Sequence, residues 1–458
     1  MSSRVGAVAF WLLAWQLVAT VLHQPLILPA PSGVASALAG LVTSAGFWGK
    51  VWFSFSRIMG GCALAYAVAG ALAACARASQ VTRALVRVPM FVFKSTPVAC
   101  VVVLLLIWLG SANVSLAAVF LMAVPGVYFA LLEGLDHLDT KLVELFRVYG
   151  VGGIRRFLLL TWRGVAPFLV AASEVVVGMS WKAGVAAELI GSPLGSIGER
   201  IYQSKLLLDT PGLFAWTVVV IGLATLCEKA FLCLLRMSGR AAVSLSVRMR
   251  PRSSSAGPSS ARGALSLDGV VLPHGAAAGR PVSVAAAAGG RLCVMGPSGA
   301  GKTTLLRALA GLESVPKPGC LSFDFQDDRL IEEASAFQNV AVTAASWRSD
   351  EDVRQLLQVL LPGVDADRPV SELSGGQRRR VELARALVGP GDALLLDEPF
   401  SGLDGQAHAQ ACAVVLSELR GRSLVVATHD SDDARRLAAQ TFLVPVSSVS
   451  SCQQRRAL

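Results

Sequence analysis

The amino-terminal half of the sequence is dominated by long apolar stretches without charged side chains. The run from Val5 to Leu22 contains no charge, and further apolar runs follow as far as residue 235. About 20 such residues are enough to cross a lipid bilayer as a helix. The composition agrees, because 53% of the 458 residues are hydrophobic and only 16% are charged. The sequence therefore excludes an ordinary soluble protein and predicts a part that lies in lipid.

The apolar runs predict an all-α polytopic membrane bundle of about six transmembrane helices over residues 1–245. The charge-free run 95–132 is too long for one helix, and the residues Gly110–Asn113 are expected to turn it. The first run could instead be a signal peptide. A retained helix is favoured, because Arg4 is the only basic residue before it and no small-residue cleavage site follows at once. The expected spans are 5–22, 58–76, 98–109, 116–132, 165–190 and 213–235.

Positive charge is concentrated in this first half. Residues 1–250 hold 20 Lys and Arg against nine Asp and Glu, a net charge of +11, whereas the remaining residues hold 21 and 22, a net charge of −1. The basic residues lie mostly in alternate short loops, the pattern of cytoplasmic loops, so both termini are expected in the cytoplasm. They do not form a basic, aromatic-rich soluble surface, and no nucleic-acid partner is expected.

The fifth expected span contains three ionisable residues, and the whole sequence contains nine cysteines. Glu174, Lys182 and Glu188 all fall in the fifth span, where charge is costly. They are expected either to line a translocation path or to form a structural pair, with Glu174 and Lys182 on one helical face, and an interfacial cap. The cysteines form no CxxC pair and are odd in number. They are therefore interpreted as small buried hydrophobic residues rather than disulfide partners or zinc ligands.

The second half changes in character after residue 245. Residues 246–264 are rich in Ser, Arg, Pro and Gly and are expected to form a flexible linker. From residue 265 to 458, short apolar strands alternate with helical segments, which predicts an α/β domain.

A glycine-rich segment, GPSGAGKT, follows the apolar strand LCVM and precedes a helical stretch, the context of a P-loop. Glycines let successive backbone N–H groups converge on phosphate oxygens at a helix N-terminus. Lys302 is expected to neutralise the β- and γ-phosphates of ATP, and Thr303 to place its hydroxyl on Mg²⁺. The expected nucleotide-binding residues are Gly296, Pro297, Ser298, Gly299, Ala300, Gly301, Lys302, Thr303 and Thr304.

Two further segments carry phosphate chemistry. The apolar run ALLLDEPF ends in two acids, so Asp397 is expected to hold Mg²⁺ and Glu398 to act as general base on water. The segment SELSGGQRRR opens a helix with small residues that can approach a phosphate closely. Its expected nucleotide contacts are Ser374, Gly375, Gly376 and Gln377.

Together these motifs make the second half resemble the ATPase subunit of ABC transporters. The P-loop, LSGGQ, LLLDEP, SGLD and VVATHD occur in the order typical of that family. The resemblance implies that Gln326 contacts Mg²⁺ and water, that His429 reaches the γ-phosphate, and that Asp404 lies at a dimer interface. Family ATPases act as head-to-tail dimers, so it also implies a homodimer with two ATP sites. The family's adenine-stacking aromatic is missing upstream of the P-loop, where only His274 is available.

Residues 140–166 resemble the EAA loop of bacterial importer permeases, whose short helix docks on the ATPase. Glu144 and Gly150 have the spacing of that loop, whereas Leu145 and Phe146 stand in place of its two alanines. A basic amphipathic surface helix is the alternative interpretation.

Most of residues 1–235 resembles the nitrate, sulfonate and taurine branch of importer permeases, to which thiamine-precursor importers are close. The resemblance implies a fused permease and ATPase in the bacterial cytoplasmic (inner) membrane. It would import a small solute, such as an anion of that kind, delivered by a separate extracytoplasmic binding protein. An ABC exporter half-transporter and an ATP-driven regulatory complex that moves no solute are the alternatives. The motifs do not identify the solute.

Overall fold

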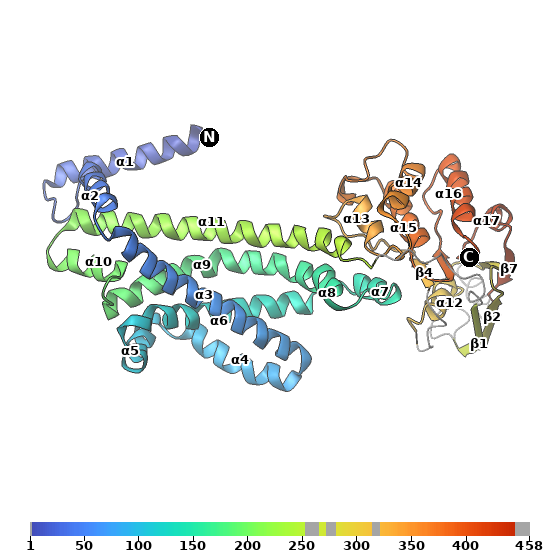
Figure 1. Cartoon of the computed structure of the whole chain (residues 1–458), viewed down its shortest axis with the longest axis horizontal. Coiled ribbons are helices and arrows are strands. Elements are labelled where there is room, and N and C mark those ends of the chain that lie inside the picture. The colour runs from blue at the N-terminus through green and yellow to red at the C-terminus, as the bar shows by residue number, and fades with distance from the viewer. Residues whose placement is uncertain (1, 252–264, 272–280, 314–320, 445–458) are drawn as a thin grey trace, which may run out of the picture. The chain divides into compact units, whose positions relative to one another are not determined.

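The computed structural model describes residues 2–251, 265–271, 281–313 and 321–444 (Figure 1). The chain divides into two compact units. The first contains Met1–His137 and Gly164–Ser238, and the second contains Leu138–Arg163 and Gly239–Leu458. The segment expected to dock on the ATPase therefore belongs to the same unit as the ATPase. Most of the expected linker, residues 252–264, lies outside the described residues.

The first unit is built from helices alone, in agreement with the predicted fold class. Among the described residues of the chain, five stretches are long and apolar enough to cross a membrane: α1, α3, α6 with the turn before it, the stretch Gly153–Gly191 that contains α9, and α11. The elements are α1 (Ser2–Leu22), α2 (Pro31–Thr43), α3 (Phe47–Ala78), α4 (Gln80–Ser95), α5 (Val98–Leu109), η1 (Ser111–Asn113), α6 (Val114–Asp136), α9 (Arg163–Gly191), α10 (Ile197–Leu206) and α11 (Thr210–Arg248).

The predicted third span, residues 98–109, is wrong as an independent crossing. It corresponds to α5, which has 12 residues and is about 18 Å long, shorter than the hydrocarbon core. A sixth span results only if α4 and α5 count together, and the chain bends by 106° between these two helices. The bend follows from Pro97, because the residue before a proline avoids the helical region, and Thr96 is extended with ψ 128°. The expected turn at Gly110 is present, with φ 72°.

Large apolar side chains cover the outside of these helices. Trp11, Leu85, Ile107 and Trp108 each expose about 70% of their surface. Soluble proteins rarely expose such continuous apolar surface, whereas a lipid bilayer solvates it. The exposed band therefore supports a multi-pass membrane unit.

Helices α3 and α6 lie side by side (Figure 1), and Gly61 of α3 is at their contact. A Cβ added to Gly61 would lie 2.4 Å from the Leu116 carbonyl oxygen, whereas at Gly60 its nearest neighbour would be a side-chain carbon at 3.8 Å. We expect Gly61→Ala to destabilise the protein by about 1–3 kcal/mol, because the added methyl group meets backbone that cannot move aside easily. Thermal unfolding of the detergent-purified chain should show a lower midpoint for Gly61→Ala. Equal midpoints for Gly61→Ala and the matched control Gly60→Ala would contradict this packing.

Glu174 and Glu188, two of the three ionisable residues of the predicted fifth span, have partners on other elements of the structure. Glu174 forms an ion pair with Arg236 of α11 at 3.1 Å, and Lys182 is exposed. The predicted Glu174–Lys182 pair is wrong, because eight residues advance a helix by about 12 Å. Glu188 is fully buried and accepts hydrogen bonds from the Ser54 hydroxyl at 2.6 Å and from the Gly198 N–H at 3.2 Å. It therefore helps hold the N-terminus of α10.

The second unit contains the predicted α/β domain. Its five-stranded sheet is parallel with the order β4-β5-β6-β3-β7, and β1 and β2 form a separate antiparallel pair. The strands are β1 (Leu265–Val271), β2 (Pro281–Ala286), β3 (Arg291–Met295), β4 (Leu321–Asp324), β5 (Ala393–Asp397), β6 (Ser423–Ala427) and β7 (Gln440–Leu443). The helical elements are α7 (Thr140–Val148), α8 (Gly153–Arg156), η2 (Phe157–Trp162), α12 (Lys302–Leu309), α13 (Ala336–Ala341), α14 (Asp350–Leu360), η3 (Val370–Glu372), α15 (Gly375–Val388), α16 (Gly405–Glu418) and α17 (Ser431–Arg436).

Strands β5 and β6 at the centre of the sheet are buried along their whole length, as expected of a parallel sheet covered on both faces. The carboxyl ends of parallel strands meet at one edge of a sheet, where ligands bind in open α/β folds. The P-loop follows β3, Gln326 follows β4, Glu398 follows β5, and His429 follows β6. The topology thus gathers the expected site residues at one edge.

Candidate functional site

The loop between β3 and α12 has the backbone geometry of a phosphate cradle. Gly299 and Gly301 adopt positive φ angles of 81° and 104°, which glycine tolerates best. The Lys302 ammonium group folds back and donates hydrogen bonds to the carbonyl oxygens of Gly296 at 2.8 Å and Pro297 at 3.2 Å. The positive charge is therefore held over the loop, next to the position that the first turn of α12 offers to an anion.

Asp397, at the end of β5, has a buried carboxylate without a hydrogen-bond donor among the described residues. Burial raises its pKa to about 6, and the neighbouring Thr303 side chain opposes part of that rise. Asp397, Thr303 and Gln326 line one cleft of about 240 Å³. A carboxylate, a hydroxyl and an amide oxygen are ligands that suit Mg²⁺, so the residues present fit this ion.

Glu398 lies between two other expected site residues. Its carboxylate accepts a hydrogen bond from the Gln326 side-chain amide at 3.5 Å, and its other oxygen lies 3.7 Å from His429 Nδ1. Glu398 also has a φ angle of 46°, a left-handed conformation that is uncommon for residues other than glycine. Such conformations cluster at functional sites, where the surrounding structure supports them. The structure therefore brings Gln326, Glu398 and His429 together.

The residues Ser374–Gln377 of the LSGGQ motif, here called the signature segment, lie outside the clefts that contain the residues described above. The same holds for Asp404. Ser374 is the N-cap of α15, in a capping box with Gln377, and is exposed. The Asp404 carboxylate caps α16 by accepting the N–H groups of Gln406 and Ala407. Neither of the two clefts that contain the residues above is lined by Ser374–Gln377 or Asp404. Among the described residues of one chain, Ser374–Gln377 and Asp404 therefore lie outside the two clefts that the P-loop, Gln326, Glu398 and His429 line.

Arg379 is a residue that the sequence reasoning missed. It lies one turn inside α15, and its guanidinium donates to the carbonyl oxygens of Asp397 at 2.8 Å and Glu398 at 3.2 Å. It also donates to the Phe325 carbonyl oxygen at 2.7 Å and pairs with Asp324 at 2.9 Å. Through Arg379, helix α15 thereby fixes the backbone that follows β4 and the backbone that follows β5. Both lie at the cleft lined by Thr303, Gln326 and Asp397. The RRR run after the signature was the available signal.

The helix α7 packs into the hydrophobic core of the α/β domain. Leu145 and Phe146, the two residues that replace the family's alanines, are buried in one cluster with Phe323. Tyr149 is also buried in this cluster, and its hydroxyl donates to the Phe323 carbonyl oxygen at 3.1 Å. Gly150 ends the helix with a φ angle of 66°, so the glycine is required by backbone geometry.

Charged groups fix the position of α7 beside the nucleotide site. Glu144 forms two hydrogen bonds to Arg307 of α12, at 2.9 and 3.1 Å, and one to Arg329 at 2.8 Å. These two arginines hold the pKa of Glu144 below its usual value. Lys141 pairs with Asp327 at 3.0 Å. Arg307 follows the P-loop, and Asp327 and Arg329 follow Gln326, so α7 contacts both phosphate-handling segments.

The sequence reasoning identified Glu144 but not its partners Arg307, Arg329 and Asp327. The QDDR run after the β4 strand was the only local signal for two of them. The possible adenine contact His274 lies outside the described residues.

Comparison with known proteins agrees with this geometry. Residues 280–401 match the ABC transporter family model, and residues 67–235 match that of the binding-protein-dependent transport system inner membrane component. The taurine import ATP-binding protein TauB of Pseudomonas aeruginosa (strain UCBPP-PA14) is 38% identical over 186 residues. That alignment covers 36% of this chain and 70% of the relative. The chain belongs to the ABC transporter family.

This ABC transporter chain joins a permease domain and an ATPase domain. Its ATPase is also 40% identical over 161 residues to the aliphatic sulfonates import ATP-binding protein SsuB 2 of Frankia alni, with 33% of this chain and 65% of that relative covered. The chain thus spans slightly less than two thirds of that relative. A solved dimeric bacterial ABC transporter cassette is 26% identical with a TM-score of 0.33, and the match covers 36% of this chain and 85% of the cassette.

Proposed function

We propose that two copies of this chain form an importer that uses ATP hydrolysis to move a small organic anion across the bacterial inner membrane. The solute would be a sulfonate of the taurine or alkanesulfonate class, delivered by a separate extracytoplasmic binding protein. The observation that carries the proposal is the contact of α7 with both phosphate-handling segments, through Glu144, Arg307 and Arg329. The relatives named for taurine and aliphatic sulfonate import support the solute class.

The residues at the edge of the sheet are suited to in-line attack of water on the γ-phosphate of ATP. Glu398 would accept a proton from the attacking water, and Gln326 and His429, on either side of it, would orient that water and the phosphate. Lys302 would exchange its contacts with the loop carbonyl oxygens for phosphate oxygens. Arg379 keeps the backbone of Asp397 and Glu398 in place during this exchange.

Thr303, Gln326 and Asp397 would hold Mg²⁺ in their shared cleft. The ion would supply positive charge that compensates the phosphate oxygens when bound. The ionised carboxylate of Asp397 would provide the negative charge that holds the ion in this buried position.

Homodimerisation would complete each ATP site, because Ser374–Gln377 line neither of the two clefts at the sheet edge of their own chain. We expect Lys302→Ala and Ser374→Arg each to abolish ATP hydrolysis when both chains of the dimer carry the same substitution. Hydrolysis should return when a Lys302→Ala chain pairs with a Ser374→Arg chain. The mixed dimer then has one site with both defects and one site with neither. Phosphate release should recover to about half of the wild-type rate per mixed dimer. No recovery, with mixed dimers shown by two affinity tags, would mean that each chain forms its own site.

Movement would pass from the ATP site to the permease through α7. When the two ATPases close around ATP, Arg307 and Arg329 would carry Glu144 with them, and the membrane helices attached to either side of α7 would follow. This sequence of events opens the path toward the binding protein, and hydrolysis returns it toward the cytoplasm, where both termini would lie.

Import is tested by trapping the full chain with ATP as its Glu398→Gln variant in membranes from the source cells. An extracytoplasmic solute-binding protein should co-purify in amounts equal to the dimer, and taurine or an alkanesulfonate should be released from it. The Lys302→Ala variant is the matched control, because it lacks the ammonium group that contacts ATP and should not capture the protein. An ATP-closed dimer without a binding protein, together with ATP-dependent solute release from cells, would identify an exporter.

A further inference from the structure

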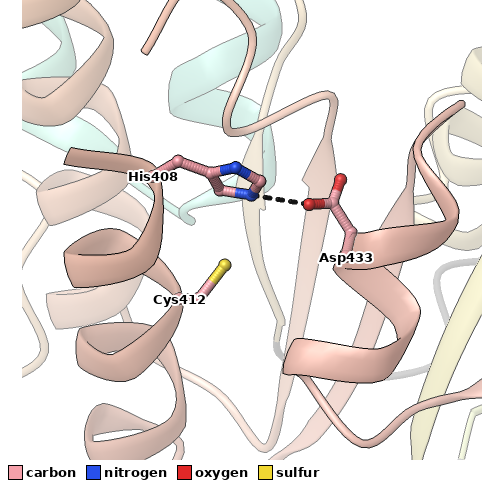
Figure 2. Close-up of side chains that lie close together, drawn as sticks. All are labelled: His408, Cys412 and Asp433. Carbon is pink, nitrogen blue, oxygen red and sulfur yellow. Dashed lines mark hydrogen bonds and ion pairs between the residues drawn. The ribbon is translucent and has the colours of Figure 1, made fainter. Parts of the chain in front are cut away.

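A second group of donor side chains lies on the α/β domain, outside the proposed catalytic residues. His408 and Cys412 are one turn apart on α16, and Asp433 faces them from α17 (Figure 2). The His408 ring nitrogen, the Cys412 sulfur and a carboxylate oxygen of Asp433 lie within 4.8 Å of one another. The thiol and the carboxylate are almost completely buried, and His408 is largely buried. All three side chains point toward one shared volume.

The types and spacing of these donors suit zinc. Zinc prefers imidazole nitrogen, thiolate sulfur and carboxylate oxygen, at about 2.0–2.3 Å in a tetrahedron, so its ligand atoms lie about 3.3–3.8 Å apart. His408 Nε2 and Asp433 Oδ1 are 2.7 Å apart. Shifts of about 1 Å would bring the three atoms into that range. A thiolate ligand disfavours Mg²⁺ and Ca²⁺, which bind oxygen.

The group also has an open side. His408 and Asp433 line a cleft of about 250 Å³ that contains His429 and Glu398 as well. Water or a solute group in this cleft can supply the fourth ligand that three protein donors leave open.

Asp433 connects the three donors to the segment that carries His429. Its Oδ2 accepts a hydrogen bond from the Thr428 hydroxyl at 2.5 Å, and that hydroxyl accepts the Asp430 N–H at 3.0 Å. Thr428 and Asp430 are the residues on either side of His429. A displacement of the Asp433 carboxylate therefore changes the hydrogen bonds that hold His429.

We propose that His408, Cys412 and Asp433 form an inhibitory Zn²⁺ site that controls the position of His429. Binding breaks the His408–Asp433 hydrogen bond and the Cys412 S–H bond, forms one bond from zinc to each side chain, and releases the thiol proton to water. The imidazole binds through Nε2, so the Nε2 proton that His408 donates to Asp433 before binding is released to water and Nδ1 takes up one proton from water. The inhibition, unlike the binding, rests on the function proposed above. A displacement of about 1 Å in a catalytic group can lower a rate by up to about 100-fold.

The binding test uses the full-length chain in detergent, treated with a chelator and free of nucleotide. Calorimetric titration with Zn²⁺ should give one site per chain, and Co²⁺ should give the absorption band of a thiolate–cobalt bond. Cys412→Ala and His408→Gln should each weaken binding at least about tenfold and change the cobalt spectrum. Cys293→Ala is the matched control, because it removes another buried thiol of the same domain. Equal zinc binding by Cys412→Ala and Cys293→Ala would overturn the site.

The regulatory test measures ATP hydrolysis at buffered free Zn²⁺ with excess Mg²⁺. Zinc should lower the rate about ten- to 100-fold for the wild type and Cys293→Ala, and leave Cys412→Ala unaffected. Zinc binding at Cys412 without any change in rate would overturn the inhibitory role. If no variant hydrolyses ATP at all, the proposed function fails, and the titration without nucleotide still decides the metal site.

Discussion

Replacing Glu398 by glutamine is expected to lower ATP hydrolysis by about 10²–10⁴-fold while ATP binding is retained. Glutamine keeps the size of the side chain and can still contact Gln326 and His429, but it cannot accept the proton of the attacking water. The Lys302 ammonium group and the P-loop backbone, which would bind the phosphates, are unchanged. Phosphate release by the purified full chain and binding of a fluorescent ATP analogue measure the two quantities.

The control for this experiment is the same substitution at an exposed glutamate outside the clefts. Glu372 lies in the turn before the signature helix and pairs only with Arg368 among the described residues. Surface pairs of this kind contribute little to stability, so Glu372→Gln should keep the wild-type rate. A Glu398→Gln chain that hydrolyses ATP within about threefold of wild type would exclude Glu398 as the general base.

Replacing Glu144 by glutamine is expected to reduce solute uptake at least about tenfold, which corresponds to about 1.4 kcal/mol of lost coupling. The substitution removes the charge that both Arg307 and Arg329 contact. Among the described residues, Asp327 is then the one acidic partner left to the buried Arg329 guanidinium. ATP binding should persist, because no phosphate-binding residue changes. Uptake of labelled taurine by cells, divided by the ATP hydrolysed by the purified chain, reports the coupling.

Two further variants test whether the loss of uptake is due to the charge of Glu144. Glu133→Gln changes an exposed glutamate at the end of α6, whose only acid–base partner among the described residues is His137, and should leave uptake unchanged. Exchanging the charges in Glu144→Arg with Arg307→Glu should restore part of the uptake, because the pair reforms while Arg329 still opposes it. Uptake by Glu144→Gln equal to that of Glu133→Gln would show that this pair does not transmit movement.

The sequence predicts those parts of the site whose residues stand next to one another in the chain. The P-loop, the DE pair after β5 and the VVATHD segment are short, and each follows an apolar strand, so their elements and their common edge could be predicted. The partners of Glu144 could not be predicted in this way, because Arg307 and Arg329 lie more than 160 positions further along the chain. Only the folding of α7 onto the domain brings them together.

The errors in the membrane half have a similar origin. Basic residues such as Arg83, Arg87 and Lys94 concealed α4, because a hydropathy argument excludes charged helices. The angular positions of Glu174 and Lys182 predict a pair, but the rise of about 12 Å along the helix separates them. The cysteines were judged by their spacing to one another, and for this reason Cys412 was not connected with His408 one turn away or with Asp433 on another helix.

Helix α7 and the ATPase domain on which it packs belong to the same polypeptide. Their encounter is intramolecular, at an effective concentration that a covalent connection typically raises to the millimolar range. An interface made by the nine residues of α7 can therefore remain occupied at an intrinsic affinity too weak to hold two separate proteins together. Synthesis also fixes the ratio of this permease domain to this ATPase domain at one to one, so each copy of the ATPase domain is made together with a permease domain.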